Sequence, residues 1–262
     1  MKIVVCIKQV PDTNEVKIDP KTGTLIREGV PSIINHDDKN ALEEALKLKD
    51  KYKDVHITVL TMGPPQADVA LREALAMGAD RAILISDRAF AGSDTWATAK
   101  TLTAAVKKIK DYDIIFCGRQ AIDGDTAQVG PQLAEDLGIP QITYVTHLEI
   151  NGSTVKAHRA LEDGYEVLTT KTPCLLTAIK ELNQPRYSSI RGVFEAYNEK
   201  NVEVWNAKDI DISSDETGLN SSPTNVRQTF TPSPKGQGMV LEGSGRDTVC
   251  ELLFKLGEKH LI

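Results

Sequence analysis

The sequence predicts an α/β protein built on a mostly parallel, doubly wound sheet, and three observations lead to this fold class. Apolar runs rich in β-branched residues alternate repeatedly with helical patterns over the first half of the chain. The first run, residues 3–10 (IVVCIKQV), lacks the polar alternation of a strand that faces water on one side. The chain has 262 residues, 40% of them hydrophobic and 26% charged, which is enough to bury a globular core.

The elements of the first half follow one another in strand–helix order. Expected strands cover residues 3–10, 56–62, 81–85 and 114–117. Residues 16–26 predict a small hairpin. Residues 35–40 then lead into a helix, in which Asn40 and Glu43 have capping-box spacing.

Three further helices have recognisable ends. One begins after Pro64-Pro65 and ends at Gly78, which is typical of a C-cap. Another opens at Asp94-Thr95, and Trp96 falls on its apolar stripe, so we expect Trp96 in the core. The last covers residues 131–137.

Beyond Gly138 the pattern predicts a β-hairpin extension, with a turn at Asn151-Gly152. The elements expected there are strands at residues 143–150, 154–158, 165–170 and 174–179, a loop at 182–190 and a helix at 191–199. Residues 213–238 are poor in apolar side chains, so the α/β domain should end at 212 and an extended arm should cover 213–243. Residues 244–262 regain helical period, and such a lone amphipathic helix must dock elsewhere.

Composition excludes several classes of function. The formal charge of −6 gives no reason to expect nucleic acid as a partner. No apolar run is long enough for a membrane span, and the start of the chain lacks a signal-peptide pattern. The four cysteines are far apart and form no CxxC pair, so we expect a cytoplasmic protein without disulfides or a zinc site.

A ligand site is expected beyond the carboxyl ends of the parallel strands. The loops there cover residues 6–11, 35–40, 62–65 and 118–130. The last loop, GRQAIDGDTAQVG, has small residues and ends at a helix N-terminus, where free N–H groups suit a pyrophosphate. We interpret Asp123 and Asp125 as turn formers, caps or ribose acceptors rather than catalytic acids. Arg119 either pairs with a phosphate or flavin group or is solvated.

Other chemistries find no support. The sequence has no GxGxxG after the first strand, no P-loop and no GxSxG elbow. His36 with Asp37 and Asp38 is interpreted as a helix start rather than a metal site, and Cys6 and Cys117 as buried hydrophobes. The residues alone thus predict a nucleotide-binding domain without a catalytic nucleophile or general base.

Four segments resemble the electron-transfer flavoprotein β-subunit family. They are VVCIKQV at residues 4–10, the loop GRQAIDGDTAQ from Gly118, the signature AHRALEDGYEVL at 157–168 with PCLLT at 173–177, and LNQPRYSSI at 182–190. The resemblance covers nearly the whole chain. It implies an adenine-nucleotide α-hydrolase-like variant of the Rossmann fold, and a heterodimer with an α subunit that carries its own FAD.

The resemblance also implies the site residues. The nucleotide site carries over to Cys6, Asn35, His36, Asp37, Asp38, Met62, Gly118, Arg119, Gln120, Ala121, Ile122, Asp123, Gly124, Asp125, Thr126, Ala127, Gln128 and Val129. The partner-docking loop carries over to Leu182, Asn183, Pro185, Arg186, Tyr187 and Ile190, with Ile190 as the apolar anchor. No catalytic residue and no metal ligand is implied.

Members of the family differ in what this site holds. Simple carriers bind AMP, whereas an electron-bifurcating group binds a second FAD and oxidises NADH. Residues 35–45 depart from the carrier pattern, and Gly124 stands where carriers often have an acid, which leaves room for a bulkier ligand. Together with residues 91–95 (AGSDT), these features favour FAD over AMP.

The function implied is transfer of electrons from NADH to two acceptors. One electron would go to ferredoxin or flavodoxin, and the other through the α-subunit FAD to an acyl-CoA dehydrogenase-type flavoenzyme. The arm is expected to wrap the α subunit and to deliver the terminal helix to it. The alternatives are a non-bifurcating carrier with AMP, a stand-alone adenine-nucleotide-binding protein, and, with least support, a hydrolase using Asp123 or Asp125.

Overall fold

The structure, a computed structural model, describes residues 1–12, 31–227, 236 and 238–262. The chain forms two units, Met1–Val226 and Arg227–Ile262. The hairpin expected at residues 16–26 lies outside the described residues.

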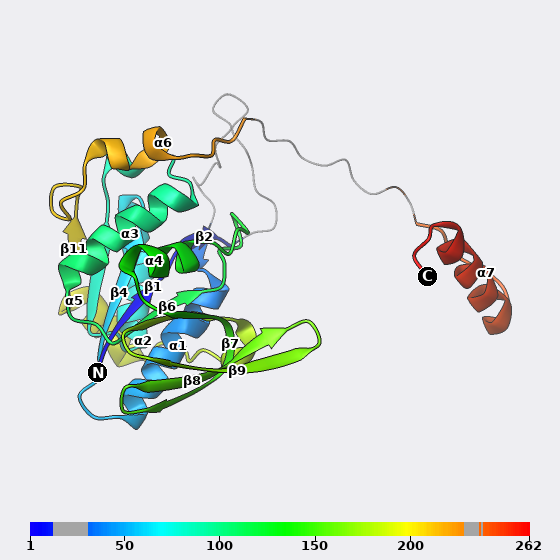
Figure 1. Cartoon of the computed structure of the whole chain (residues 1–262), viewed down its shortest axis with the longest axis horizontal. Coiled ribbons are helices and arrows are strands. Elements are labelled where there is room, and N and C mark those ends of the chain that lie inside the picture. Colours follow the sequence, from blue (N-terminus) through cyan, green and yellow to red (C-terminus); the bar gives the residue numbers. More distant parts are fainter. Residues whose placement is uncertain (13–30, 228–235, 237) are drawn as a thin grey trace. The chain divides into compact units, whose positions relative to one another are not determined.

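A nine-stranded sheet forms the first unit and confirms the predicted fold class (Figure 1). Its order is β11-β5-β4-β1-β6-β10-β7-β8-β9, parallel as far as β7 and antiparallel from β7 to β9. The strands are β1 (Lys2–Cys6), β4 (His56–Met62), β5 (Arg81–Ile85), β6 (Ile114–Gly118), β7 (Gln141–Asn151), β8 (Thr154–Leu161), β9 (Gly164–Lys171), β10 (Cys174–Ala178) and β11 (Val202–Trp205). A separate antiparallel pair joins β2 (Gln9–Pro11) to β3 (Ser32–Ile34).

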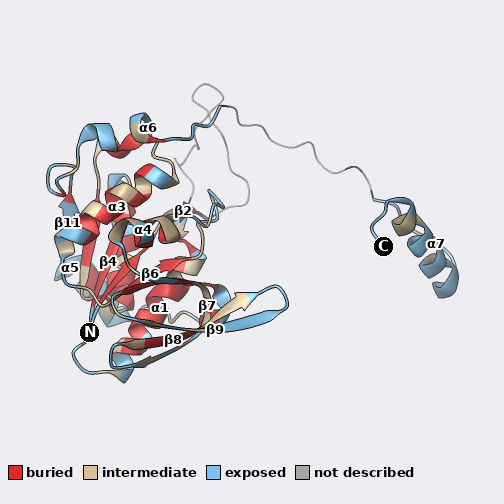
Figure 2. Ribbon diagram, viewed as in Figure 1, coloured by how far each residue is buried: buried red, intermediate tan, exposed pale blue. Residues whose placement is uncertain are grey.

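Helices cover both faces of the sheet. The helices of this unit are α1 (His36–Lys51), α2 (Asp68–Met77), α3 (Thr95–Ile109), α4 (Val129–Leu137), α5 (Ile190–Asn198) and the short α6 (Gly218–Ser221). One core cluster joins α1 and α2 to the face that carries Ile3 and Val5, and a second joins α3 and α4 to the face that carries Val4 and Cys6. Figure 2 shows the central strands as buried, whereas the helices combine buried positions with intermediate and exposed ones. Because β1 pairs in parallel with both β4 and β6, the carboxyl ends of these three strands lie at one edge of the sheet.

Two expectations about local structure near this edge were wrong. The first strand ends at Cys6, and the chain continues into the separate β2–β3 pair: the Lys8 amide donates to the Asp38 side chain, and the Lys8 carbonyl accepts from the Asn35 amide, directly after β3. Helix α1 begins at His36, with Asn35 as the N-cap residue. Asn40 and Glu43 are therefore buried inside the helix, and their spacing is not a capping box.

Three further differences lie elsewhere. Trp96 is 43% exposed and lies against the ammonium of Lys100 instead of in the core. Strand β11 was not expected, although it pairs in register with β5. Residues 213–226 do not begin an arm: Ser222 Oγ accepts a bond from the Asp94 amide at 2.9 Å, so the first unit continues to Val226.

The second unit contains α7 (Gly245–Glu258), which confirms the expected terminal helix. Ser244 caps it by accepting a bond from the Asp247 amide. Its apolar side chains Val249, Leu252, Leu253 and Phe254 are exposed. Among the described residues, no helix has the length and apolar character needed to cross a membrane.

Candidate functional site

The predicted site residues converge at the carboxyl edge of the sheet. We call the set formed by Cys6, residues 35–38, Met62 and residues 118–129 the carboxyl-edge site. Cys6 ends β1, Met62 ends β4, and residues 118–129 connect β6 to α4. Residues 36–38 lie in the first turn of α1, Asn35 is its N-cap residue, and α1 contacts β6.

Asp38 joins two strand ends beneath this site. Its carboxylate accepts a bond from the Lys8 amide at 2.8 Å and another from the Gly118 amide at 2.9 Å. The residue is only 7% exposed. Burial raises the pKa of the Asp38 carboxyl from 3.8 to about 7, although hydrogen bonds from Lys8, Asn35 and Gly118 lower it in part. Asp38 therefore acts on the backbone around the site.

Gly118 is required by this close approach. A Cβ atom at this position would lie 2.2 Å from Asp38 Oδ1 and 2.7 Å from the Asp38 main-chain nitrogen. Any side chain would push the first turn of α1 away from the end of β6.

Asn35 fixes the loop that follows Gly118. Its side chain is fully buried, its Nδ2 donates to the Gln120 carbonyl at 2.8 Å, and its Oδ1 accepts from the Ile122 amide at 3.1 Å. It makes no side-chain capping bond to α1. The Asn35 side chain thus fixes the conformation of the loop main chain.

The two loop aspartates are held within the same network. Lys8 Nζ lies 2.6 Å from Asp123 Oδ1, and Gln120 Nε2 donates to Asp125 Oδ1. Arg119 Nε lies 3.3 Å from Asp37 Oδ2, yet neither atom makes a well-aligned hydrogen bond within the described residues. These contacts agree with a turn-forming role for Asp123 and Asp125, and leave Arg119 and Asp37 able to bind a further polar group.

The end of the loop presents main-chain donors. Asp125 and Ala127 have left-handed backbone angles, with φ of 51° and 52°, and Gln128 returns to the right-handed region before α4 starts. In the described part of the chain, the N–H groups of residues 126–129 donate to no protein acceptor. Alternating left- and right-handed residues at a helix N-terminus form a concave set of amides that binds anions.

The two cysteines near this site, Cys6 and Cys117, contribute to packing. Cys6 and Cys117 are both buried, and the pKa of the Cys117 thiol is raised by its contact with Cys6 and by burial. A thiol with a raised pKa is a poor nucleophile. Groups of three or more metal-ligating side chains do not occur among the described residues.

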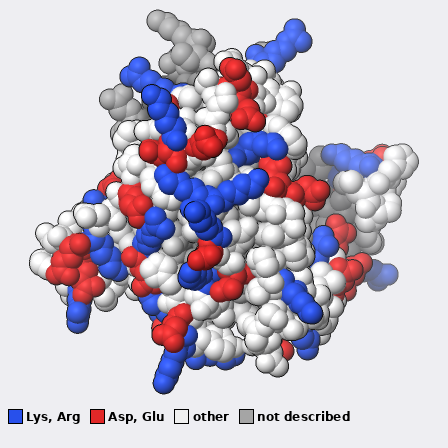
Figure 3. Space-filling view, turned by 60° about the vertical axis from the view of Figure 1, so that its left-hand side comes forward, with Lys and Arg blue, Asp and Glu red and all other residues white. Residues whose placement is uncertain are grey.

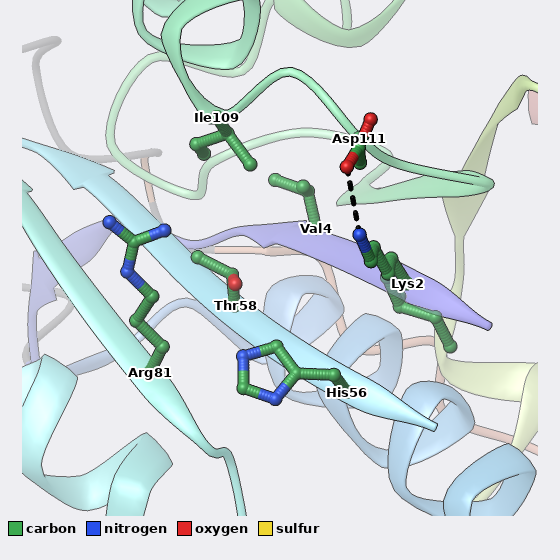
Figure 4. A pocket seen from close by; sticks show the side chains of 8 residues that line it. Lys2, Val4, His56, Thr58, Arg81, Ile109 and Asp111 are labelled. Carbon is green, nitrogen blue, oxygen red and sulfur yellow. Dashed lines mark hydrogen bonds and ion pairs between the residues drawn. The ribbon is translucent and has the colours of Figure 1, made fainter. Parts of the chain in front are cut away.

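A separate hollow of about 160 Å³ lies at the opposite edge of the sheet. It is lined by Lys2, Val4, His56, Thr58, Arg81, Ile109 and Asp111, together with Ile3 (Figure 4). Lys2 pairs with Asp111 at 2.9 Å, and Arg81 pairs with Glu203 at 2.6 Å. Its basic groups are therefore neutralised within the chain, and it is not the predicted site. On the face in Figure 3, acidic side chains likewise lie beside basic ones.

The predicted docking residues divide into two groups. Tyr187 and Ile190 are 98% and 93% exposed. Leu182 is buried, and Asn183, Pro185 and Arg186 are partly buried beside α1. Sequence reasoning missed the α1 residues that hold this loop, namely Asn40, Glu43 and Glu44. The signal was available, because these polar residues lie among the apolar positions of the helix.

Comparison with known proteins gives a consistent result. Residues 22–210 match the family described as "Electron transfer flavoprotein domain". The chain is 60% identical over 262 residues, the full length of both chains, to "Electron transfer flavoprotein subunit beta" of Thermoanaerobacterium thermosaccharolyticum. It is 57% identical over 263 residues, again the full length of both, to "Caffeyl-CoA reductase-Etf complex subunit CarD" of Acetobacterium woodii. It is 48% identical over 270 residues, the full length of both, to "Acryloyl-CoA reductase electron transfer subunit gamma" of Anaerotignum propionicum.

Proposed function

The chain belongs to the electron transfer flavoprotein family as a β subunit, and from this premise we propose that its carboxyl-edge site binds FAD. One observation supports the proposal above all: the N–H groups of residues 126–129, at the N-terminus of α4, donate to no protein acceptor in the described residues. A pyrophosphate needs several such donors at once.

The surrounding residues suit a dinucleotide. Asn35 and Asp38 hold the loop backbone, so the donors are in place before the ligand binds. Arg119 and Asp37 carry buried polar atoms without aligned partners in the described residues, which is the condition expected of groups that meet a cofactor. Bound FAD would supply hydride acceptance and one-electron transfer, which the protein side chains cannot.

FAD is favoured over AMP by the open space at Gly124. A Cβ atom there would meet no atom within 4 Å, so the loop leaves room beside its tip. AMP in a non-bifurcating carrier remains the second candidate, because its single phosphate would fit the same amides.

The proposed overall reaction oxidises NADH and divides its two electrons between acceptors. One electron goes to ferredoxin or flavodoxin. The other goes through the FAD of an α subunit to an acyl-CoA dehydrogenase-type flavoenzyme. Support for the second acceptor comes from the relatives, two of which are named as parts of CoA-ester reductase systems.

The remaining surfaces are assigned to partners. The exposed apolar face of α7 binds the α subunit, and the part of the second unit that precedes α7 serves as the arm that leads to it. Tyr187 and Ile190 dock the flavoenzyme, with Ile190 as the apolar anchor.

Cofactor content tests the proposal directly. The chain is coexpressed with its α subunit, and flavin and AMP are counted in the purified heterodimer, which is then titrated anaerobically with NADH. Two FAD per heterodimer and bleaching by NADH support the proposal. One FAD with one AMP, and no reaction with NADH, would establish the carrier instead. A chain that purifies alone with adenine nucleotide and does not bind the α subunit would establish the stand-alone alternative.

A further inference from the structure

Residues 183–189 connect the short turn Lys180–Leu182 to α5, and they lie along α1. The guanidinium of Arg186 binds Glu43 through Nε, at 2.9 Å to Oε2, and through Nη2, at 3.0 Å to Oε1. Nη2 also lies 2.7 Å from Asp50 Oδ2, and the Arg186 amide donates to Glu43 at 3.1 Å. One side chain therefore fastens the middle of the loop to two acids of α1.

A second pair of contacts fastens the start of the loop. Asn183 Nδ2 donates to the Asn40 carbonyl at 3.0 Å and to Glu44 Oε2 at 2.9 Å. In return, Asn40 Nδ2 donates to the Asn183 carbonyl at 2.7 Å. Asn40, Glu43 and Glu44 are all buried, so these are internal contacts.

Glu43 depends on Arg186. Glu43 is 5% exposed, and among the described residues Arg186 is the cation that pairs with it. A buried carboxylate that loses its only cation is strongly disfavoured. Arg186 therefore cannot leave Glu43 to meet an acid on a partner without leaving that charge unpaired.

The clamp at Arg186 affects the exposed residues that follow it, Tyr187 and Ile190. Tyr187 points into solvent directly after the clamped Arg186, and Ile190 begins α5. An exposed loop of this kind loses conformational freedom when it docks. A loop already held in its bound form avoids that cost.

We propose that Arg186 is a positioning residue that, through Glu43 and Asp50, holds the loop so that Tyr187 and Ile190 face the partner flavoenzyme. This proposal rests on the proposed function of Tyr187 and Ile190 as docking residues. It reassigns Arg186, which the family resemblance places among the docking residues, to a role inside the subunit.

The test compares four variants of the coexpressed heterodimer: Arg186→Gln, Glu43→Gln, the double variant and Ile190→Ala. The matched control is Arg191→Gln, because Arg191 is an exposed arginine of the same region that pairs only with Glu195 among the described residues. The probe is a purified short-chain acyl-CoA dehydrogenase, and KM and kcat are measured with the heterodimer as its electron partner. Hydrogen exchange of the amides of residues 187–192 is measured on the heterodimer alone.

We expect Arg186→Gln and Glu43→Gln each to raise KM by about tenfold at unchanged kcat, the factor of a lost charge-assisted hydrogen bond. The double variant should be no worse than either single one, and the amides should exchange faster in all three. Arg191→Gln should change neither readout.

Each other outcome decides a separate question. A raised KM for Arg186→Gln with wild-type behaviour of Glu43→Gln would show that Arg186 touches the partner directly and would overturn the proposal. Unchanged hydrogen exchange in both single variants would overturn it as well. An unchanged KM for Ile190→Ala would instead refute the docking assignment, whatever the exchange rates of the clamp variants.

Discussion

The carboxyl of Asp38 should make this protein less stable as pH rises, which is the opposite of the effect of an aspartate whose pKa is lowered on folding. Burial raises its pKa to about 7 in the folded chain, against 3.8 for an ordinary aspartate. The folded state therefore binds this proton more tightly than the unfolded state. The stability that the protonated group contributes is fully present below about pH 4 and is lost as pH rises through about 7.

The magnitude follows from the two pKa values. A difference of roughly three units corresponds to about 4 kcal/mol between the low-pH and high-pH limits. Between about pH 5 and pH 8 the expected loss is about 3 kcal/mol. Replacing Asp38 by Asn removes this titration, and the cost of its altered hydrogen bonds is the same at both pH values.

The assay is guanidinium unfolding of the full-length chain at about pH 5 and pH 8, for wild type and Asp38→Asn. The free energy of unfolding of the wild type, relative to the variant, should fall by about 3 kcal/mol over this interval. Asp87→Asn is the matched control, since Asp87 also accepts two main-chain N–H bonds, from Ala89 at 3.0 Å and Ala207 at 3.2 Å. These bonds lower the pKa of the half-buried Asp87 carboxyl, so the stability difference between wild type and Asp87→Asn should stay constant over this range. Parallel pH curves for wild type and Asp38→Asn would refute the reasoning.

Three further changes should have distinct results. Gly118→Ala places a Cβ 2.2 Å from Asp38 Oδ1 and should lower stability by about 1–3 kcal/mol, seen as a lower Tm, whereas Gly124→Ala, which meets no atom within 4 Å, should leave Tm nearly unchanged. Asn35→Ala removes two bonds to the loop and should weaken retention of the bound nucleotide about tenfold, measured by dialysis of the purified heterodimer; unchanged retention would mean that the loop holds its shape without Asn35. Deleting residues from Gly243 onward should weaken the heterodimer in size-exclusion chromatography or slow turnover with the dehydrogenase, and a truncated complex that matches the wild type in both would contradict the role of α7.

The sheet, and the meeting of the four loops at one of its edges, could be predicted because they follow from periodicity. Buried parallel strands are continuous apolar runs, and the carboxyl ends of such strands meet at one edge. The amino-acid pattern is enough to select the loops at Cys6, Asn35, Met62 and Gly118, and the fold brings all four to the same edge. Hairpin β7–β8 could also be predicted from the sequence, because Asn151-Gly152 is a strong local turn signal.

The errors fall where tertiary contacts override a local pattern. Asn40 and Glu43 have the spacing of a capping box, yet the cost of burying them is offset by Asn183 and Arg186, which are distant in the sequence. Trp96 has the spacing of the apolar face of α3, but it lies in the first turn of that helix, where its side chain is partly exposed to solvent. Strand β11 is only four residues long at an edge, too short for a periodic signal.

Helix α1 links the residues that the sequence analysis missed, Asn40 and Glu43, to the carboxyl-edge site. Its first turn carries Asp38, which fixes the end of β6, and the residue before it, Asn35, fixes the loop to α4. Farther along the same helix, Asn40 and Glu43 hold the loop that leads to Ile190. An amphipathic surface helix normally buries apolar side chains, but α1 buries polar ones at both places, and each is satisfied by main-chain or charged partners. A rigid helix that contacts both loops keeps the carboxyl-edge site and residues 183–189 in a fixed relation, which is what the proposed electron transfer between bound partners would require of this subunit.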